Sequence, residues 1–187
     1  WEFPPKVVGG IARHVHDLAR ALVKSGAEVY VITCGGPGIP EREAVNGIKV
    51  QRVGMSNPAA PDFLTWVLQL NLNLIEAANR LFLSGVKFEV IHAHDWLTAY
   101  AGKNLKHSWK VPLLSTIHAT EFGRNNGLHN ELQRYISNVE WWLGYESWRV
   151  ICCSRYMYEE LRQVFQIPED KLRVSPNGVY LDEFQKT

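Results

Sequence analysis

FEVIHAHDW, at residues 88–96, decides the fold of this chain. A short apolar run at Phe88–Ala93 leads into polar residues and then into a helical pattern that begins at Trp96. The next apolar run, Val111–Ile117, is just as continuous, which is typical of strands buried on both faces. A strand, a helix and a second strand of this kind predict one parallel unit of an α/β sheet.

The same alternation extends over most of the chain. Four further apolar runs predict strands, and four further stretches with apolar residues at helical spacing predict helices. The expected strands are Ala27–Thr33, Gly47–Val53, Arg149–Cys153 and Lys171–Ser175, and the expected helices are Ile11–Lys24, Phe63–Phe82, Leu128–Trp148 and Ser154–Phe165. We therefore predict an α/β fold, a Rossmann-like three-layer domain with a mostly parallel sheet covered by helices on both faces.

Composition narrows the class of protein. The chain has 187 residues, 46% hydrophobic and 21% charged, which suits one globular domain with a full core. A net charge of +1 gives no broad attraction to nucleic acid, and no apolar stretch could cross a bilayer. Three cysteines without a C-x-x-C pair fit a reducing compartment. We expect a cytoplasmic protein with no nucleic-acid partner and no membrane association.

Residues just after the strands are the first candidates for a site, because ligands of open α/β sheets bind beyond the carboxyl ends of the strands. Asp95 could accept hydrogen bonds from sugar hydroxyls or stabilise positive charge at an anomeric carbon, or it could simply cap the next helix. His118 follows the next strand, where an isolated histidine is often only a packed residue. Glu121 could act as an acid, a base or an acceptor, and Arg124 could pair with it or meet a phosphate. Each role is open on these residues alone.

Gly9 and Gly10 precede the first expected helix. A helix N-terminus attracts phosphate, and glycine lets the backbone come close to it. The alternative is a plain turn, because the full G-x-G-x-x-G pattern is missing.

His92 and His94 would lie on the same face of an extended strand, which suggests a metal site. The metallo-hydrolase pattern H-x-H-x-D-H is broken, since Asp95 follows His94 directly and no histidine follows it. We therefore expect no bound metal.

Several motifs, taken in order, resemble family 4 and family 5 glycosyltransferases. EFPPKVVGGIARHV at 2–15 resembles their opening loop and first helix, and HAHDW at 92–96 looks like the motif of glycogen and starch synthases. TIH at 116–118 is similar to their strand-end histidine. VICCS at 150–154 resembles the strand and cap before the inter-domain region, and VSPNGV at 174–179 resembles the junction into the second domain. The likeness spans nearly the whole chain.

The resemblance implies one half of a GT-B fold, in which two Rossmann-like domains face a cleft. We expect residues 1–175 to form the N-terminal, acceptor-side domain and residues 176–187 to begin the inter-domain linker, without the C-terminal donor-binding domain. That domain is the expected partner, together with a nucleotide-sugar donor, ADP- or UDP-linked, and an oligo- or polysaccharide acceptor. No separate cofactor is expected.

The expected site has three parts. Donor-diphosphate contacts are assigned to Gly9 and Gly10, catalytic roles to Asp95 and His118, and acceptor or sugar contacts to Glu121, Arg124 and Trp96. Glycogen synthases commonly carry a lysine where this chain has Val7, and residues 118–124 look more like a family 4 branch, which leaves the glucan acceptor open.

The resulting prediction is the N-terminal domain of a retaining hexosyltransferase that moves a sugar, with glucose favoured, from a nucleotide-sugar to a carbohydrate acceptor such as an α-glucan. We expect this fragment alone to be inactive. One alternative is a GT-B-fold nucleotide-sugar epimerase, which would need its own catalytic acids, and the run at 92–96 argues against it. Another is a non-catalytic sugar- or nucleotide-binding module.

Overall fold

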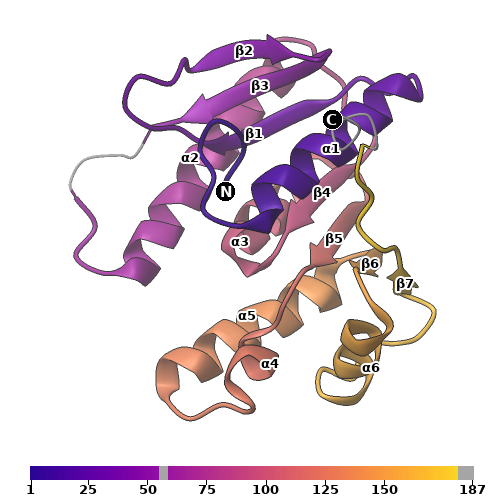
Figure 1. Ribbon diagram of the computed structural model, residues 1–187. Helices are drawn as coiled ribbons and strands as arrows, with labels where there is room; N and C mark the ends of the chain where they lie inside the picture. The colour runs from indigo at the N-terminus through magenta and orange to yellow at the C-terminus, as the bar shows by residue number, and fades with distance from the viewer. Residues whose placement is uncertain (55–58, 181–187) are drawn as a thin grey trace, which may run out of the picture.

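The computed structural model describes residues 1–54 and 59–180, and in it strands and helices alternate (Figure 1). The strands are β1 Tyr30–Cys34, β2 Arg42–Val45, β3 Ile48–Val53, β4 Ile91–His94, β5 Leu113–Ile117, β6 Arg149–Cys152 and β7 Leu172–Val174. The helices are α1 Gly10–Lys24, α2 Phe63–Leu83, the short 3-10 helix η1 Trp96–Thr98, α3 Ala99–Trp109, α4 Glu121–Asn125, α5 Glu131–Glu146 and α6 Arg155–Gln163.

Every strand and helix expected from the sequence is present, with ends that differ by a few residues. Ser154 caps α6 as expected, because its side chain accepts the Met157 N–H at 3.1 Å. Two short elements were not expected. Strand β2 alternates exposed and half-buried residues without an apolar run, and α4 is a five-residue helix.

The sheet is divided into two hydrogen-bonded parts, with strand orders β1-β3-β2 and β4-β5-β6-β7. All neighbouring strands are parallel except β2 and β3. The mostly parallel pairing is confirmed, but the two parts are not joined, since β1 and β4 are each the edge of their own part.

Helices cover both faces of these strands, which gives the three-layer Rossmann-like arrangement. Val50 of β3 packs with Ala19 of α1, whereas Val53, of opposite parity, packs with Leu70 of α2. Helices α3 and α5 pack around Leu113, and α6 belongs to a separate core cluster. No helix in the described parts of the chain is long and apolar enough to span a membrane.

The chain continues beyond β7 along the surface, where the ring of Tyr180 lies 4.1 Å from the guanidinium of Arg20. The expected linker, residues 176–187, falls partly outside the described residues, because 181–187 are not among them.

Arg52 on β3 contacts the N-terminal loop and holds it against the sheet. Its side chain is fully buried, and its Nη2 donates to the Pro4 carbonyl at 2.7 Å and to the Glu43 carboxylate. Its Nη1 donates to the Pro40 carbonyl at 3.1 Å. These contacts hold the loop of residues 1–9 that leads into α1.

Arg52→Ala should lower the free energy of unfolding by about 3 kcal/mol, because it removes a buried ion pair and two hydrogen bonds to backbone carbonyls. Urea denaturation followed by circular dichroism measures this loss. Arg162→Ala is the control, since it removes an exposed ion pair with Glu159 and should cost less than about 1 kcal/mol. Equal losses in the two variants would contradict the anchoring role of Arg52.

Candidate functional site

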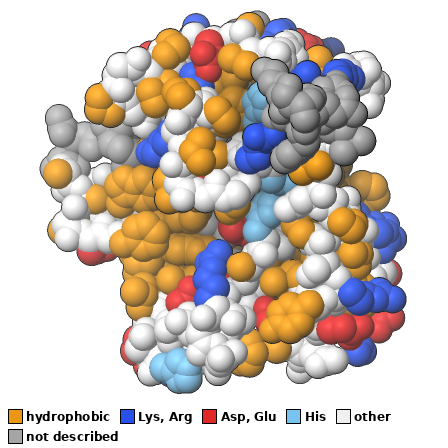
Figure 2. Space-filling model, viewed as in Figure 1, with side chains coloured by type: hydrophobic (Ala, Val, Ile, Leu, Met, Phe, Trp, Pro, Cys, Tyr) orange, Lys and Arg blue, Asp and Glu red, His pale blue; other side chains and the backbone are white. Residues whose placement is uncertain are grey.

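The carboxyl ends of β4 and β5 and the start of α1 open onto one hollow of about 560 Å³. The residues that line it include all seven that the sequence analysis assigned to the site: Gly9, Gly10, Asp95, Trp96, His118, Glu121 and Arg124. In the view of Figure 2, histidine side chains gather in the recess between the upper and lower parts of the molecule. The structure thus brings the predicted residues together, and their individual roles stay predictions.

Asp95 is buried and held in a strained backbone conformation. It is 2% exposed, and its φ of 56° and ψ of 174° fall in a region that is essentially restricted to glycine. Its Oδ1 accepts the backbone N–H of His118 at 2.8 Å, and its Oδ2 lies 3.9 Å from Nη2 of Arg124. The side chain makes no cap to η1, so the capping alternative is wrong. Asp95 instead joins the ends of β4 and β5.

Burial raises the pKa of Asp95 to about 6, and the hydrogen bond from the His118 amide and the charge of Arg124 oppose this rise. The carboxylate is therefore charged at neutral pH but poorly solvated. A fixed charge in such a dry site interacts strongly with charge that develops on a bound ligand.

Four histidine rings contact one another near this carboxylate, three of them stacked and the ring of His14 edge-on to them. The rings of His92 and His94 lie 4.2 Å apart, and the ring of His14 lies 4.8 Å from that of His118. Nδ1 of His94 and Nε2 of His118 share a hydrogen bond of 3.2 Å. Burial lowers the pKa of all four, to about 4 for His92 and His118, so each imidazole is neutral at pH 7. A neutral imidazole can donate one hydrogen bond and accept another, as recognition of hydroxyl groups requires.

The same cluster could also hold a metal ion. Ring nitrogens of His14, His94 and His118 all lie within 4.8 Å of one another, and Nε2 of His14 is buried without a hydrogen-bond partner. Neutral imidazoles are ligands that Zn²⁺ accepts at about 2.0–2.1 Å. Such binding would break the hydrogen bond between His94 and His118. The sequence analysis missed His14, which lies one turn after Gly10 and whose ring contacts that of His118.

The glycine pair leaves open space in front of α1. Helix α1 begins at Gly10 without a side-chain cap or an acidic residue in its first turn. A Cβ atom on Gly10 would meet nothing within 4 Å, so packing does not require glycine there. The Gly9 amide is already in use, because it donates to the carboxylate of Glu2 at 2.8 Å. The Gly10 end of the helix remains able to receive an anion.

Two buried carboxylates hold α4, which carries Glu121 and Arg124 toward the hollow. Thr120 caps this helix and donates its hydroxyl to Glu160. Glu140 of α5 accepts the Glu121 N–H at 2.9 and 3.0 Å. The sequence analysis missed both carboxylates, although an acidic residue at a core position of an expected helix is a usable signal.

Trp96 is mainly a core residue. It is 4% exposed and packs edge-on against Phe63 at 5.9 Å, which leaves little of the indole for stacking on a sugar. Phe63 is 53% exposed and also lines the hollow. Cys153, another lining residue, places its thiol 3.6 Å from Nδ1 of His118.

Glu140→Gln should raise the melting temperature at pH 8 by several degrees relative to the unsubstituted chain, and the difference should vanish near pH 4.5. Burial raises the pKa of Glu140 from 4.5 to about 8, so its stabilising protonated form is lost as pH rises through that window. Glutamine stays neutral and keeps an oxygen for the Glu121 N–H. At this size about 1 kcal/mol shifts the melting temperature by about 2–4 °C.

The measurement is a series of thermal melts between pH 4.5 and 8. Glu131→Gln is the matched control, because Glu131 is exposed at the start of the same helix and should give no such pH-dependent difference. A constant difference between Glu140→Gln and the unsubstituted chain at all pH values would refute the assignment.

The fold is that of the N-terminal domain of a GT-B glycosyltransferase. The chain belongs to Glycosyltransferase Family 4, whose sequence pattern matches residues 8–183. It is 43% identical over 186 residues to an uncharacterized glycosyltransferase of Methanocaldococcus jannaschii, covering 98% of this chain and 46% of the relative. It is 35% identical over 193 residues to a glycogen synthase of Mycobacterium tuberculosis, covering 96% and 47%.

Among solved structures, a sucrose-phosphate synthase from Thermosynechococcus elongatus is similar in fold, with a TM-score of 0.78 and 20% identity. The match covers 94% of this chain and 44% of that one. The chain thus spans about half the length of the relatives it matches.

Proposed function

We propose that the full-length polypeptide is a retaining hexosyltransferase that moves a sugar, glucose first among the candidates, from an ADP- or UDP-linked donor to an acceptor such as an α-glucan. The observation that carries this proposal is the convergence of Gly10, Asp95 and His118 on one hollow in a Family 4 chain. The 35% identity to a glycogen synthase supports the glucan acceptor.

In this proposal Asp95 and His118 are catalytic residues that act on the transferred sugar. Asp95 has one oxygen tied to the His118 amide, and the other, Oδ2, faces Arg124 at the hollow. That oxygen accepts a hydrogen bond from a sugar hydroxyl or stabilises the positive charge that develops at the anomeric carbon. The neutral ring of His118 binds a second hydroxyl in place of its contact with His94 or Cys153, and it adds no positive charge.

The donor diphosphate lies at the start of α1, where Gly10 permits close approach and the helix end favours negative charge. Arg124, whose side chain is 45% exposed, is near enough to Asp95 to meet a phosphate or the acceptor, and Glu121 beside it binds acceptor hydroxyls. No metal and no separate cofactor take part. The second domain supplies the rest of the donor site, and the free thiols of the described cysteines support a cytoplasmic location.

The test is a donor screen on the full-length polypeptide, with ADP-glucose and UDP-glucose offered together with glycogen, and with hydrolysis and transfer both measured. Asp95→Asn should lower kcat by about 100-fold or more, because the amide oxygen keeps the His118 contact but loses the charge. The chain of residues 1–187 alone is the negative control and should show no turnover. Release of an epimerised sugar, or tight binding without any turnover, would favour the alternatives and reject the transferase.

Gly10→Val in the full-length polypeptide should raise KM for the donor at least about tenfold, equivalent to about 1.4 kcal/mol. The added side chain enters space that the proposal assigns to the diphosphate, and its Cβ meets no protein atom within 4 Å. Gly54→Val is the control, because a Cβ there also meets nothing within 4 Å and Gly54 does not line the hollow. Unchanged donor KM with an unchanged melting temperature would remove Gly10 from the donor site.

A further inference from the structure

Three histidines from different elements bring their ring nitrogens together beside the hollow. His14 lies on α1, His94 is the last residue of β4, and His118 follows β5. One ring nitrogen of each lies within 4.8 Å of those of the other two. The sequence expectation of no bound metal concerned a pattern along one strand, whereas this set takes one nitrogen from each of three elements. Three imidazoles with a fourth position open to water are an established ligand set for Zn²⁺.

The spacing of two of these nitrogens already suits a shared metal ion. Nδ1 of His94 lies 3.2 Å from Nε2 of His118. Two nitrogens that each bind Zn²⁺ at about 2.0–2.1 Å in tetrahedral geometry are about 3.3–3.4 Å apart. The ring of His14 is edge-on to both of the others, with its centre 4.8 Å from that of His118 and 5.6 Å from that of His94. A small rotation of the His14 side chain would complete the set.

Nε2 of His14 lacks a partner in the described parts of the chain. It is buried and makes no hydrogen bond. Native structures rarely leave a buried polar atom unpaired, because its lost contact with water is then not replaced. A metal ion bound at this nitrogen would supply the missing partner. His16, two residues further along α1, differs in this respect, because both of its ring nitrogens are hydrogen-bonded, to Asp17 and Asn46.

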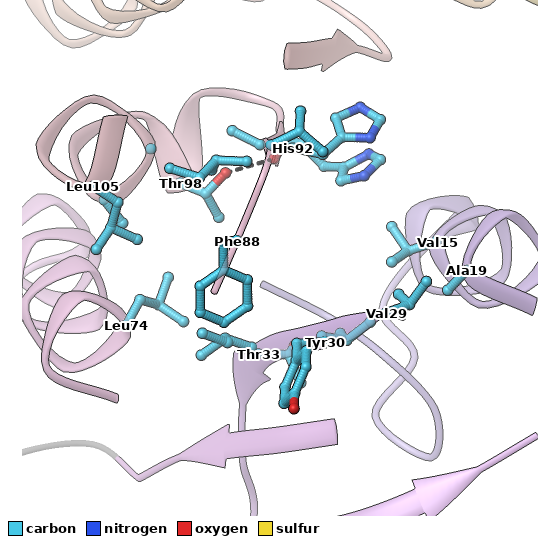
Figure 3. Close-up of a pocket in the computed structure, with 18 of the residues that line it drawn as sticks. Val15, Ala19, Val29, Tyr30, Thr33, Leu74, Phe88, His92, Thr98 and Leu105 are labelled. Atoms are coloured by element: carbon cyan, nitrogen blue, oxygen red, sulfur yellow. Dashed lines mark hydrogen bonds between the residues drawn. The ribbon is translucent and has the colours of Figure 1, made fainter. Parts of the chain in front are cut away.

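Neighbouring residues hold the other two rings in place. Thr98 donates its hydroxyl to the His94 carbonyl at 3.2 Å. His94 lines an apolar cavity of about 220 Å³ and stacks on His92, which lies at the upper end of that cavity in Figure 3. Nδ1 of His118 lies 3.6 Å from the Cys153 thiol, so it can donate to this sulfur while Nε2 binds a metal. Outer contacts of this kind fix the tautomer and orientation of metal-binding histidines.

Two buried carboxylates near His118 favour a cation at this position. Asp95 is 2% exposed and accepts the His118 amide at 2.8 Å. Glu2 is 3% exposed. Burial and the charge of Arg124 lower the pKa of His118, whereas the carboxylate of Glu2 raises it, so Glu2 is close enough to act on positive charge at this ring. A buried divalent cation needs opposite charge nearby, and these two carboxylates supply it.

We propose that His14, His94 and His118 form a binding site for a divalent transition-metal ion, with Zn²⁺ as the ion that best suits three imidazoles and one water. The ion replaces the hydrogen bond between His94 and His118. The proton in that bond moves to the opposite nitrogen of the ring that carries it, so both rings stay neutral. Mg²⁺ and Ca²⁺ do not suit the site, because they prefer oxygen ligands.

The bound ion inhibits transfer and takes no part in the reaction. In the proposed function the ring of His118 binds a sugar hydroxyl at the hollow. An ion at its Nε2 occupies the nitrogen that faces His94 and fixes the ring, which prevents that contact. The inhibition therefore rests on the proposed function, whereas metal binding itself does not.

Binding is measured first, without any activity, on the full-length polypeptide with Co²⁺ as a spectroscopic substitute for Zn²⁺. Four-coordinate Co²⁺ absorbs visible light much more strongly than the hydrated ion, so a Co²⁺ titration should give an absorption band that added Zn²⁺ removes. Anomalous diffraction from crystals soaked in Zn²⁺ should then place an ion about 2.0–2.1 Å from one nitrogen of each of the three histidines. No band, or an ion bound only elsewhere, would overturn the proposal.

His14→Gln should weaken Zn²⁺ binding at least about 100-fold, because the loss of an outer contact alone costs about 10- to 100-fold. His16→Gln is the matched control on the same helix and should keep the affinity within about twofold, because His16 is outside the three-histidine set. Melting temperatures measured without metal show whether each variant is folded. Equal Zn²⁺ affinity in the two folded variants would reject His14 as a ligand.

Inhibition is measured on the same polypeptides, each relative to its own rate without metal. Zn²⁺ that saturates the site should lower turnover at least about tenfold in the unsubstituted polypeptide and in His16→Gln, whereas His14→Gln should need at least about 100-fold more Zn²⁺. The same concentration of Mg²⁺ should have no inhibitory effect. Saturated binding with full turnover would reject the inhibitory role. Absence of turnover in every sample would reject the proposed function, and the Co²⁺ band would still decide the metal site.

Discussion

The hydrogen bond from the His118 amide to Asp95 is the contact on which the rest of the site depends. Strands β4 and β5 pair in parallel with His94 opposite Thr116, so their polar continuations leave the sheet side by side. Asp95 adopts a backbone conformation that costs on the order of 1–3 kcal/mol for a residue with a side chain. Two hydrogen bonds hold Asp95 in this conformation. Its backbone N–H donates to the Thr116 carbonyl, and its carboxylate accepts the backbone N–H of His118. The strain turns the carboxylate toward the next strand end instead of into η1.

Around this contact the site combines buried carboxylates with uncharged imidazoles. Burial raises the pKa of Asp95 and Glu140 and lowers the pKa values of the histidines. The two shifts are opposite because burial disfavours the charged form of each group. Arg124 is the one lysine or arginine among the described residues that line the hollow, and its Nη2 lies 3.9 Å from Asp95. The hollow is lined by the carboxylates of Asp95 and Glu121 and by the neutral ring of His118, all of which can bind hydroxyl groups by hydrogen bonds. The start of α1 adds positive potential without another ionised side chain.

The fold could be predicted from the sequence because parallel strands that are buried on both faces give continuous apolar runs, as in Val111–Ile117. The location of the candidate site could be predicted because ligands of open α/β sheets bind beyond the carboxyl ends of the strands. That rule selects Asp95 and His118. What could not be predicted depends on tertiary packing. Trp96 is buried because it packs in a core cluster with Val67 of α2 and Val139 of α5, and the role of Glu140 follows from a backbone amide nineteen residues away.

The loop of residues 1–9 shows why core and site cannot be treated separately. It is held at three points: Trp1 pairs with the end of β1, Pro4 accepts from the buried Arg52, and Glu2 accepts from Gly9. The first contact comes from β1, the second comes from β3 and the third closes the loop on itself, and together they determine where α1 begins. Because the open space at Gly10 is defined by that starting point, a change in β1 or β3 that releases this loop also displaces the helix end that faces the hollow. The contacts of this loop with β1 and β3 are therefore a condition for the geometry of the site.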